Sequence, residues 1–307
     1  MQVERHTGGS IPQTREPAYS LFRARTFSSP VLIAAPHGGR NYPPRLRARL
    51  RESDGAGDPL LRLEDRLIDV LALGVARRSG SACLIAHAPR ALLDLNRAPD
   101  DVDWSMISDG HDADTARHAS RRSNNGLGLI PRRLAGFGEL WRGPFTIREL
   151  HDRIDGIHTP YHRVLGQTLS DIRDQWGIAV LIDLHSMPPL RTADGSGAEF
   201  VVGDRFGTSA HTDLSAAALD TLGAKGRRVA HNRPYAGGYV LDRHGDRRRS
   251  YHAIQIEVCR SLYLDVHMRE QTARSQAVVK LLCDLTKRLA DEAAMLANPG
   301  WRDKAAE

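Results

Sequence analysis

The chain has 307 residues, of which 41% are hydrophobic and 26% are charged, as expected for a globular protein of enzyme size with a sizeable core. Its formal net charge of +6 indicates either a solvated basic surface or the attraction of an anionic substrate. Nucleic-acid binding is disfavoured, because aromatic residues make up only 6% of the chain and do not alternate with the basic residues.

The cysteines are odd in number and form no C-x-x-C motif, which argues against a disulfide framework and for a reducing compartment. Residues 1–15 are polar and do not predict a signal peptide. The sequence contains no run of about 18 apolar residues that would predict a membrane span. We therefore expect a cytoplasmic protein, and the sequence leaves its oligomeric state open.

The first predicted core element is a strand at residues 30–35. Residues 1–20 are polar and read as a tail or an edge segment, whereas 30–35 form a short apolar run that ends in Pro36-His37-Gly38-Gly39. A buried strand thus delivers His37 at its end. Residues 61–78 follow with helical spacing of apolar side chains, and Glu64, Asp65 and Asp69 lie early in this predicted helix. These acids either interact favourably with the helix dipole or supply a metal ligand.

Two further strands are expected at 82–86 and 90–95, and the second ends in Asp94-Leu95-Asn96-Arg97. An irregular region, 98–146, then begins. A loop of that length in a compact domain is usually functional or disordered, so we interpret it as an insertion that covers the site.

The apolar residues between 147 and 176 recur on one helical face, with Pro160 at a predicted kink. A buried strand at 180–184 comes next and presents Asp183, His185 and Ser186, and the prolines after Met187 stop it. Helix followed by strand is the rhythm of a mainly parallel sheet. The remaining expected elements are strands at 199–202, 228–230 and 252–258 and helices at 208–223 and about 270–297.

The sequence has no repeat and no linker-like segment, so we expect one domain over 21–307 that contains the 98–146 insertion. Useful side chains stand at the predicted strand ends or early helix turns. Two histidines with one carboxylate are the ligands of zinc sites that keep a position open for water. A further carboxylate and several arginines would be needed to move a proton and to hold an anionic substrate. The candidates for these roles at the predicted strand ends and early helix turns are His37, Asp65, Arg90, Asn96, Arg97, His185 and Glu257.

The chain resembles the N-formylglutamate amidohydrolase family. Its Asp-Leu-Asn-Arg segment is also similar to the aspartoacylase and zinc carboxypeptidase group. The resemblance spans residues 30 to about 265. It implies a phosphorylase/hydrolase-like three-layer α/β/α sandwich with a mixed, mainly parallel sheet. The matching segments are Pro36-His37-Gly38-Gly39, Glu64-Asp65-Arg66-Leu67-Ile68-Asp69, Asp94 to Pro99, Asp183-Leu184-His185-Ser186, Gly237-Gly238-Tyr239, Arg243-His244-Gly245 and Gln255-Ile256-Glu257-Val258.

The resemblance also implies an activity, namely hydrolysis of a small anionic N-acyl amino acid, N-formyl-L-glutamate first, with one zinc ion per chain. By position, it makes His37, Asp65 and His185 the zinc ligands and Glu257 the general base and acid. Three further roles follow for side chains that contact the substrate. Arg90 would polarise the scissile carbonyl, Asn96 and Arg97 would bind the α-carboxylate, and Arg243 would meet a second carboxylate.

Some alternatives stay open at the level of sequence. Glu64 or Asp69 could replace Asp65 as the acidic ligand, and Glu257 could instead form a structural salt bridge with Arg260. The function could also be that of a carboxypeptidase-like or other amide hydrolase with a larger substrate. A non-catalytic basic binding protein on the same fold is the alternative from outside the enzymes.

Overall fold

The structure is a computed structural model that describes residues 3–51, 58–109, 125–190 and 197–298. Within these residues, eight strands form one mixed sheet in the order β1-β2-β4-β3-β7-β10-β8-β9. The strands are β1 (Glu4–Gly8), β2 (Tyr19–Arg23), β3 (Val31–Ala35), β4 (Ala82–Ala86), β7 (Ala179–Met187), β8 (Phe200–Gly203), β9 (Val229–His231) and β10 (Tyr251–Cys259).

The central strands β4, β3, β7 and β10 run parallel to one another, and β8 is parallel to β9. Antiparallel pairs join β1 to β2, β2 to β4 and β10 to β8. This confirms the expected mixed sheet with a parallel centre. Of these, β3, β4 and β7 are buried along their whole length, which explains why they appear in the sequence as largely apolar runs.

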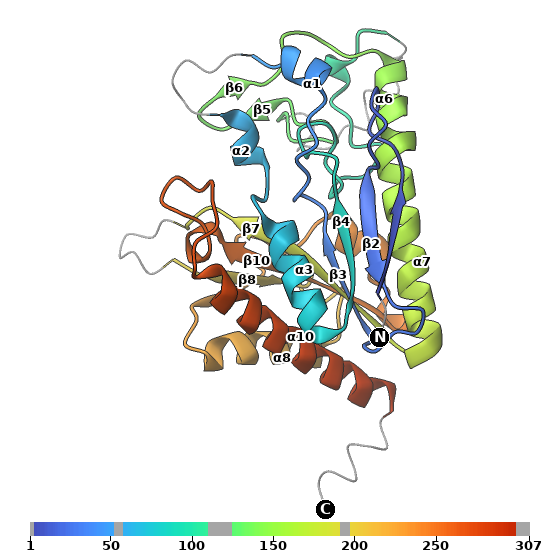
Figure 1. Ribbon diagram of the computed structural model, residues 1–307, viewed down its shortest axis with the longest axis vertical. Coiled ribbons are helices and arrows are strands. Elements are labelled where there is room, and N and C mark those ends of the chain that lie inside the picture. Colours follow the sequence, from blue (N-terminus) through green and yellow to red (C-terminus); the bar gives the residue numbers. More distant parts are fainter. Residues whose placement is uncertain (1–2, 52–57, 110–124, 191–196, 299–307) are drawn as a thin grey trace, which may run out of the picture.

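Helices cover both faces of the sheet, as the three-layer prediction requires (Figure 1). On one face, α3 (Ile68–Ser79), α8 (Thr212–Ala224) and α10 (Ser275–Ala297) pack against inward-pointing residues of the central strands. On the other face lie α7 (Thr159–Trp176) and α9 (Tyr239–His244). The described residues contain no helix that is both long and apolar enough to cross a membrane.

The long predicted helix at 147–176 is present with one irregularity. It consists of α6 (Ile147–Arg153), a π-helical turn (Ile154–His158) and α7. Thr146 caps α6 by accepting a hydrogen bond from the Glu149 backbone while the Glu149 side chain bonds the Thr146 backbone N–H. The π-helical turn lies just before Pro160, which occupies the first turn of α7, where proline is tolerated; the expected kink stays a prediction.

Two sequence predictions for the segment between residues 61 and 95 are wrong. Residues 61–78 do not form one helix: α2 (Pro59–Leu63) ends before Glu64, and α3 begins after Leu67, whose φ of 58° is left-handed. The backbone N–H of Asp65 instead donates to the His37 carbonyl at 3.0 Å. A tertiary contact therefore overrides the helical pattern and places Asp65 in a turn rather than in a helix.

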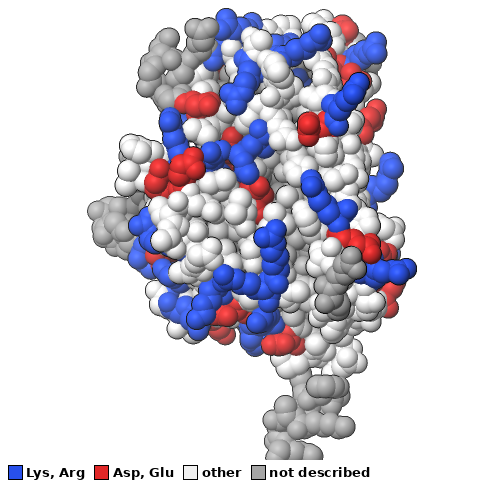
Figure 2. Space-filling view, in the orientation of Figure 1, with Lys and Arg blue, Asp and Glu red and all other residues white. Residues whose placement is uncertain are grey.

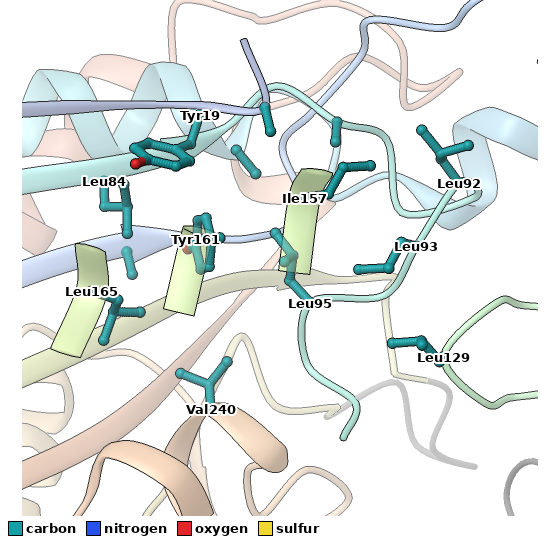
Figure 3. Packing of buried hydrophobic residues seen from close by; sticks show 14 of the residues in the cluster. Tyr19, Leu84, Leu92, Leu93, Leu95, Leu129, Ile157, Tyr161, Leu165 and Val240 are labelled. Carbon is teal, nitrogen blue, oxygen red and sulfur yellow. The ribbon is translucent and has the colours of Figure 1, made fainter. Parts of the chain in front are cut away.

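Residues 90–95 do not form a strand either but a series of turns, with Leu92 donating to Pro89 and Arg97 to Asp94. Their apolar character has another cause. Figure 3 shows Leu92, Leu93 and Leu95 on an irregular loop beside the helix that carries Ile157 and Tyr161, and all five side chains are buried in one cluster. The loop is apolar because it packs against a helix, not because it lies in the sheet.

The remaining short elements are α1 (Pro44–Ala48), β5 (Arg133–Leu134), β6 (Gly138–Glu139) and 3-10 turns at Trp104–Met106, Arg247–Arg249 and Arg260–Leu262. In Figure 1 the first three gather with α2 beyond the ends of the central strands. Part of the expected 98–146 insertion, residues 110–124, lies outside the described residues. The single domain over 21–307 and its insertion stay predictions.

Candidate active site

A pocket of about 380 Å³ lies at the carboxyl ends of β3, β7 and β10, where ligands sit in open α/β sheets. It brings together all the site residues predicted from sequence except Arg243. The predicted residues that line it are His37, Asp65, Arg90, Asn96, Arg97, His185 and Glu257. Other lining residues include Arg62, Leu127, Ser186, Tyr235, Gln255 and Arg260.

The two histidines are held by buried carboxylates on one side of each ring. His37 Nε2 lies 2.7 Å from Asp94 Oδ1, and His185 Nε2 lies 2.9 Å from Asp183 Oδ2. A carboxylate accepts a hydrogen bond, so each Nε2 carries a proton, and Nδ1 is the atom of each ring that could bind a metal ion once it is not protonated. A carboxylate bound to one ring nitrogen is typical of histidines that bind a metal ion through the other nitrogen, because it fixes the orientation and the tautomer of the ring.

The free sides of both rings face Asp65. Its Oδ2 lies 2.9 Å from His185 Nδ1 and 3.6 Å from His37 Nδ1. The donor atoms of the three buried residues all lie within 4.8 Å of one another. His37 Nδ1 is buried and has no hydrogen-bond partner, which is costly unless something else binds it. Two imidazole nitrogens and one carboxylate oxygen suit a zinc ion.

Glu64 and Asp69, the other acids considered as ligands, have different partners. Asp69 forms a bidentate ion pair with Arg40 at 2.7 and 2.8 Å. Glu64 accepts a hydrogen bond from Tyr42 and pairs with Arg66 at 3.1 Å. The turn between α2 and α3 therefore directs only the middle acid toward the histidines.

Burial and charge act in opposite directions on this cluster. Burial alone would raise the pKa of Asp65, but the hydrogen bond with His185 and the charge of that ring hold the pKa well below its usual range. Burial would lower the pKa of His185, and the charges of Asp183 and Asp65 raise it instead. For Asp94, burial is likewise outweighed by Arg90 and His37, which lower its pKa. The low pKa values keep Asp65 and Asp94 ionised at neutral pH.

Glu257 lies on β10 beside His185 of β7, and the two residues are direct partners in the parallel register. Its side chain is 8% exposed and accepts a hydrogen bond from Gln255 Nε2 at 3.0 Å. Burial raises its pKa to about 7, and the nearby Asp65 charge adds to this effect. A buried carboxyl with that pKa beside a cluster of ligands is suited to accept and return a proton.

Arg260, which the sequence offered as a salt-bridge partner of Glu257, contacts other groups. It donates to Ser186 Oγ at 3.1 Å, to the Glu64 carbonyl and to Asp65 Oδ1 at 3.3 Å. Arg260 therefore orients the Asp65 carboxylate from the side opposite the histidines. Its position after β10 gave no signal of this role, because the contact spans 195 residues of sequence.

The turn at 89–97 supplies the other predicted polar groups. Arg90 pairs with Asp94 Oδ2 through Nε and Nη2, each at 3.0 Å. Asn96 Oδ1 accepts a hydrogen bond from the Val240 N–H at 2.9 Å, so its amide NH₂ group remains available to the pocket. Arg97 donates to the carbonyls of Leu127 and Asn96 at 2.9 and 2.8 Å.

Two histidines that the sequence analysis did not select bind the backbone of this turn. His158 Nε2 lies 2.9 Å from the Arg97 carbonyl, and His162 Nε2 lies 2.9 Å from the Leu95 carbonyl. Each ring must donate to its carbonyl. His158 ends the π-helical turn and His162 lies one helical turn later in α7, so the two rings face the loop from the same side of the helix. Asn96 is thus held between two anchored peptide groups.

Close backbone packing explains two glycines of the motifs. A Cβ at Gly39 would lie 2.1 Å from the Ala88 carbonyl oxygen, and one at Gly238 would lie 2.6 Å from Asn96 Oδ1. Any larger residue would separate the loop after β3 from the 89–97 turn, or displace Asn96 from the Val240 N–H. Glycine is required here by contact distance.

Arg243 is the one predicted residue that the structure places away from the pocket. It lies on α9 with an exposed side chain, donates to Tyr239 Oη at 2.6 Å and is not among the lining residues. On the face shown in Figure 2, basic and acidic side chains of the described residues are interspersed rather than gathered into a basic stripe. The net positive charge is therefore spread over that face.

Comparisons with known proteins agree with the resemblance seen in the sequence. The family described as N-formylglutamate amidohydrolase matches residues 29–264. An N-formylglutamate deformylase of Pseudomonas aeruginosa is 29% identical over 244 residues, 77% of this chain and 82% of its own. That of Pseudomonas putida is 30% identical over 269 residues, 82% of this chain and 90% of its own. The crystal structure of N-formylglutamate amidohydrolase from Ralstonia eutropha JMP134 superposes with a TM-score of 0.79 at 27% identity, covering 90% of this chain and 98% of that one.

Proposed function

Because this chain belongs to the N-formylglutamate amidohydrolase family, we propose that it hydrolyses the amide bond of N-formyl-L-glutamate to glutamate and formate. The observation that carries the proposal is the single pocket in which His37, Asp65 and His185 face one another beside Glu257. The arginines of the same pocket suit an anionic substrate. The proposed compartment, the cytoplasm, rests on the sequence alone.

The metal in this proposal is one zinc ion per chain, which His37, His185 and Asp65 would hold. The unpartnered His37 Nδ1 and the carboxylates behind both rings support this set of ligands. A zinc ion held there would supply Lewis-acid chemistry, which activates water and polarises a carbonyl group.

The protein's own groups account for the proton transfers. Glu257 takes a proton from the attacking water and returns it to the amide nitrogen as the bond to the formyl carbon breaks. Water is consumed, and formate and the free amine are released. Arg90 donates to the formyl oxygen as negative charge develops on it. The ion pair with Asp94 holds the Arg90 guanidinium in place without engaging Nη1.

The α-carboxylate of the substrate is assigned to the turn at 96–97. The NH₂ group of Asn96 and the guanidinium of Arg97 both line the pocket, and the turn that carries them is anchored by His158 and His162. A carboxylate bound there would place the formyl group toward Asp65 and the histidines. This position would bring the scissile bond to Glu257.

One prediction concerns Arg97→Lys. The ammonium keeps the charge but loses the planar fork and the bonds to the Leu127 and Asn96 carbonyls, so the change is not conservative. We expect KM for N-formyl-L-glutamate to rise about tenfold to a hundredfold, with a smaller change in kcat. Steady-state kinetics measure both constants. An unchanged kcat/KM would remove Arg97 from substrate binding.

The proposed function itself is tested by a substrate screen with and without chelator. We expect one zinc per chain by elemental analysis, formate release from N-formyl-L-glutamate, loss of this release after chelation and recovery on adding zinc. N-acetyl and N-succinyl amino acids and a C-terminal peptide serve as comparison substrates. A preference for the peptide would favour a carboxypeptidase-like hydrolase. Salt-sensitive retention on nucleic acid, without zinc or turnover, would favour a basic binding protein.

A further inference from the structure

The pocket holds more positive charge than one carboxylate needs. Four arginines, Arg62, Arg90, Arg97 and Arg260, line it together with only two carboxylates, Asp65 and Glu257. The substrate proposed above carries a second carboxylate on its side chain, and an inference about that group rests on the proposed function. Arg243 lies outside the pocket, so one of the four lining arginines is the candidate to bind this second carboxylate.

Two of the four arginines are paired with buried acids. Arg90 is bound to Asp94, and Arg260 is bound to Asp65, with the other donors of Arg260 directed to Ser186 and the Glu64 carbonyl. Their charges are thus balanced within the protein, as buried charges must be. Arg97 bonds two carbonyls and stands next to Asn96, which suits it to the α-carboxylate.

Arg62 differs from these in both its position and its partners. It lies in the last turn of α2, three residues before Asp65, with an exposed side chain. Its Nη2 donates to the Ala135 carbonyl at 2.7 Å, and its guanidinium lies beside Gly136 in the turn between β5 and β6. Within the described parts of the chain, Arg62 forms no ion pair with a carboxylate.

This single bond positions the Arg62 guanidinium while it leaves most of its five N–H donors unused. A planar fork held in this way is prepared for bidentate binding of a carboxylate. We propose that Arg62 is the specificity-determining residue that binds the side-chain carboxylate of the substrate. Arg62 would thereby select a dicarboxylic N-acyl amino acid over a neutral one of the same size.

The test compares N-formyl-L-glutamate with N-formyl-L-glutamine, which has the same shape but lacks the second charge. We expect Arg62→Met to lower kcat/KM for the glutamate compound about tenfold to a hundredfold and to leave the glutamine compound within about threefold. Arg62→Lys should recover part of the selectivity, because it restores the charge without the fork. Equal losses on both substrates would overturn the proposal.

Arg133→Met is the matched control. Arg133 lies on nearby β5, is exposed, pairs with Glu139 and does not line the pocket, so its loss removes one charge without touching the site. The selectivity of Arg133→Met for the glutamate over the glutamine compound should equal that of the unmodified protein. If Arg133→Met lost as much selectivity as Arg62→Met, the loss would come from the change in net charge and not from a contact with Arg62. If Arg243→Met instead of Arg62→Met abolished the selectivity, the role proposed for Arg62 would also be refuted.

A calorimetric measurement separates this proposal from the proposed function. Binding of L-glutamate and L-glutamine to the unmodified and Arg62→Met proteins reports the charge selectivity without turnover. If the unmodified protein hydrolyses neither formyl compound, the proposed activity is wrong, yet a preference for glutamate that Arg62→Met abolishes still supports Arg62. The same preference in both proteins would overturn the assignment.

Discussion

Asp65→Asn is expected to abolish stoichiometric zinc binding and turnover. The amide is a weak ligand without charge, and loss of the carboxylate leaves the two histidines as the strong donors of this cluster among the described residues. The Lewis-acid contribution of a metal ion amounts to several kcal/mol, so turnover should fall by roughly 10³-fold or more. Elemental analysis after dialysis against equimolar zinc measures the first effect, and formate release measures the second.

Two neighbouring acids provide matched controls for this variant. Asp69→Asn breaks the ion pair with Arg40, and Glu64→Gln weakens the contacts with Tyr42 and Arg66, but neither changes a group that faces the histidines. Both proteins should keep one zinc per chain. If Asp69→Asn or Glu64→Gln lost the metal while Asp65→Asn kept it, the acidic ligand would have to be reassigned.

The parts of the site that the sequence predicts best are those on strands. His185 and Glu257 lie in apolar segments, and a polar residue at the end of such a segment is costly unless it has a partner or a task. The spacing of two also predicts that Asp183 shares a face with His185. The sequence cannot reveal that β3, β7 and β10 are neighbours, because strand order depends on contacts between distant segments.

The predictions failed where tertiary contacts override a local pattern. The apolar residues Leu63, Leu67 and Leu71 keep helical spacing across the break that carries Asp65. What holds that break open is the Asp65 N–H bond to His37 and the Arg260 bond to Glu64, and both partners are remote in sequence. An amphipathic pattern shows which side chains are buried but not whether the backbone is continuous.

The supporting groups of the site were missed for a related reason. Asp94 belongs to a recognisable motif, yet only the structure shows it bound to both His37 and Arg90. Arg62 and Arg260 are two of 43 lysine and arginine residues, and no spacing distinguishes them. Charged residues that act on one another across the sheet become visible only when the fold brings them within hydrogen-bond distance.

Glu257→Gln is expected to keep the proposed zinc ion and to lose most of the proposed activity. Glutamine has the same size and can still bond Gln255, but it cannot accept a proton, so kcat should fall by about 10²–10⁴. The residue is outside the cluster of candidate ligands, so metal content should stay at one per chain. Elemental analysis and steady-state kinetics on the same preparation give both quantities.

The control for this variant is Glu292→Gln, which neutralises another buried glutamate on α10, where it pairs with Arg288 at 2.7 Å far from the pocket lining. Its kcat should match the unmodified protein even if its melting temperature falls. This separates a lost proton acceptor from the general effect of an altered buried charge. Loss of zinc from Glu257→Gln would make the residue a ligand, and near-normal turnover would exclude it from the proton transfer, since no other lining carboxylate remains besides Asp65 among the described residues.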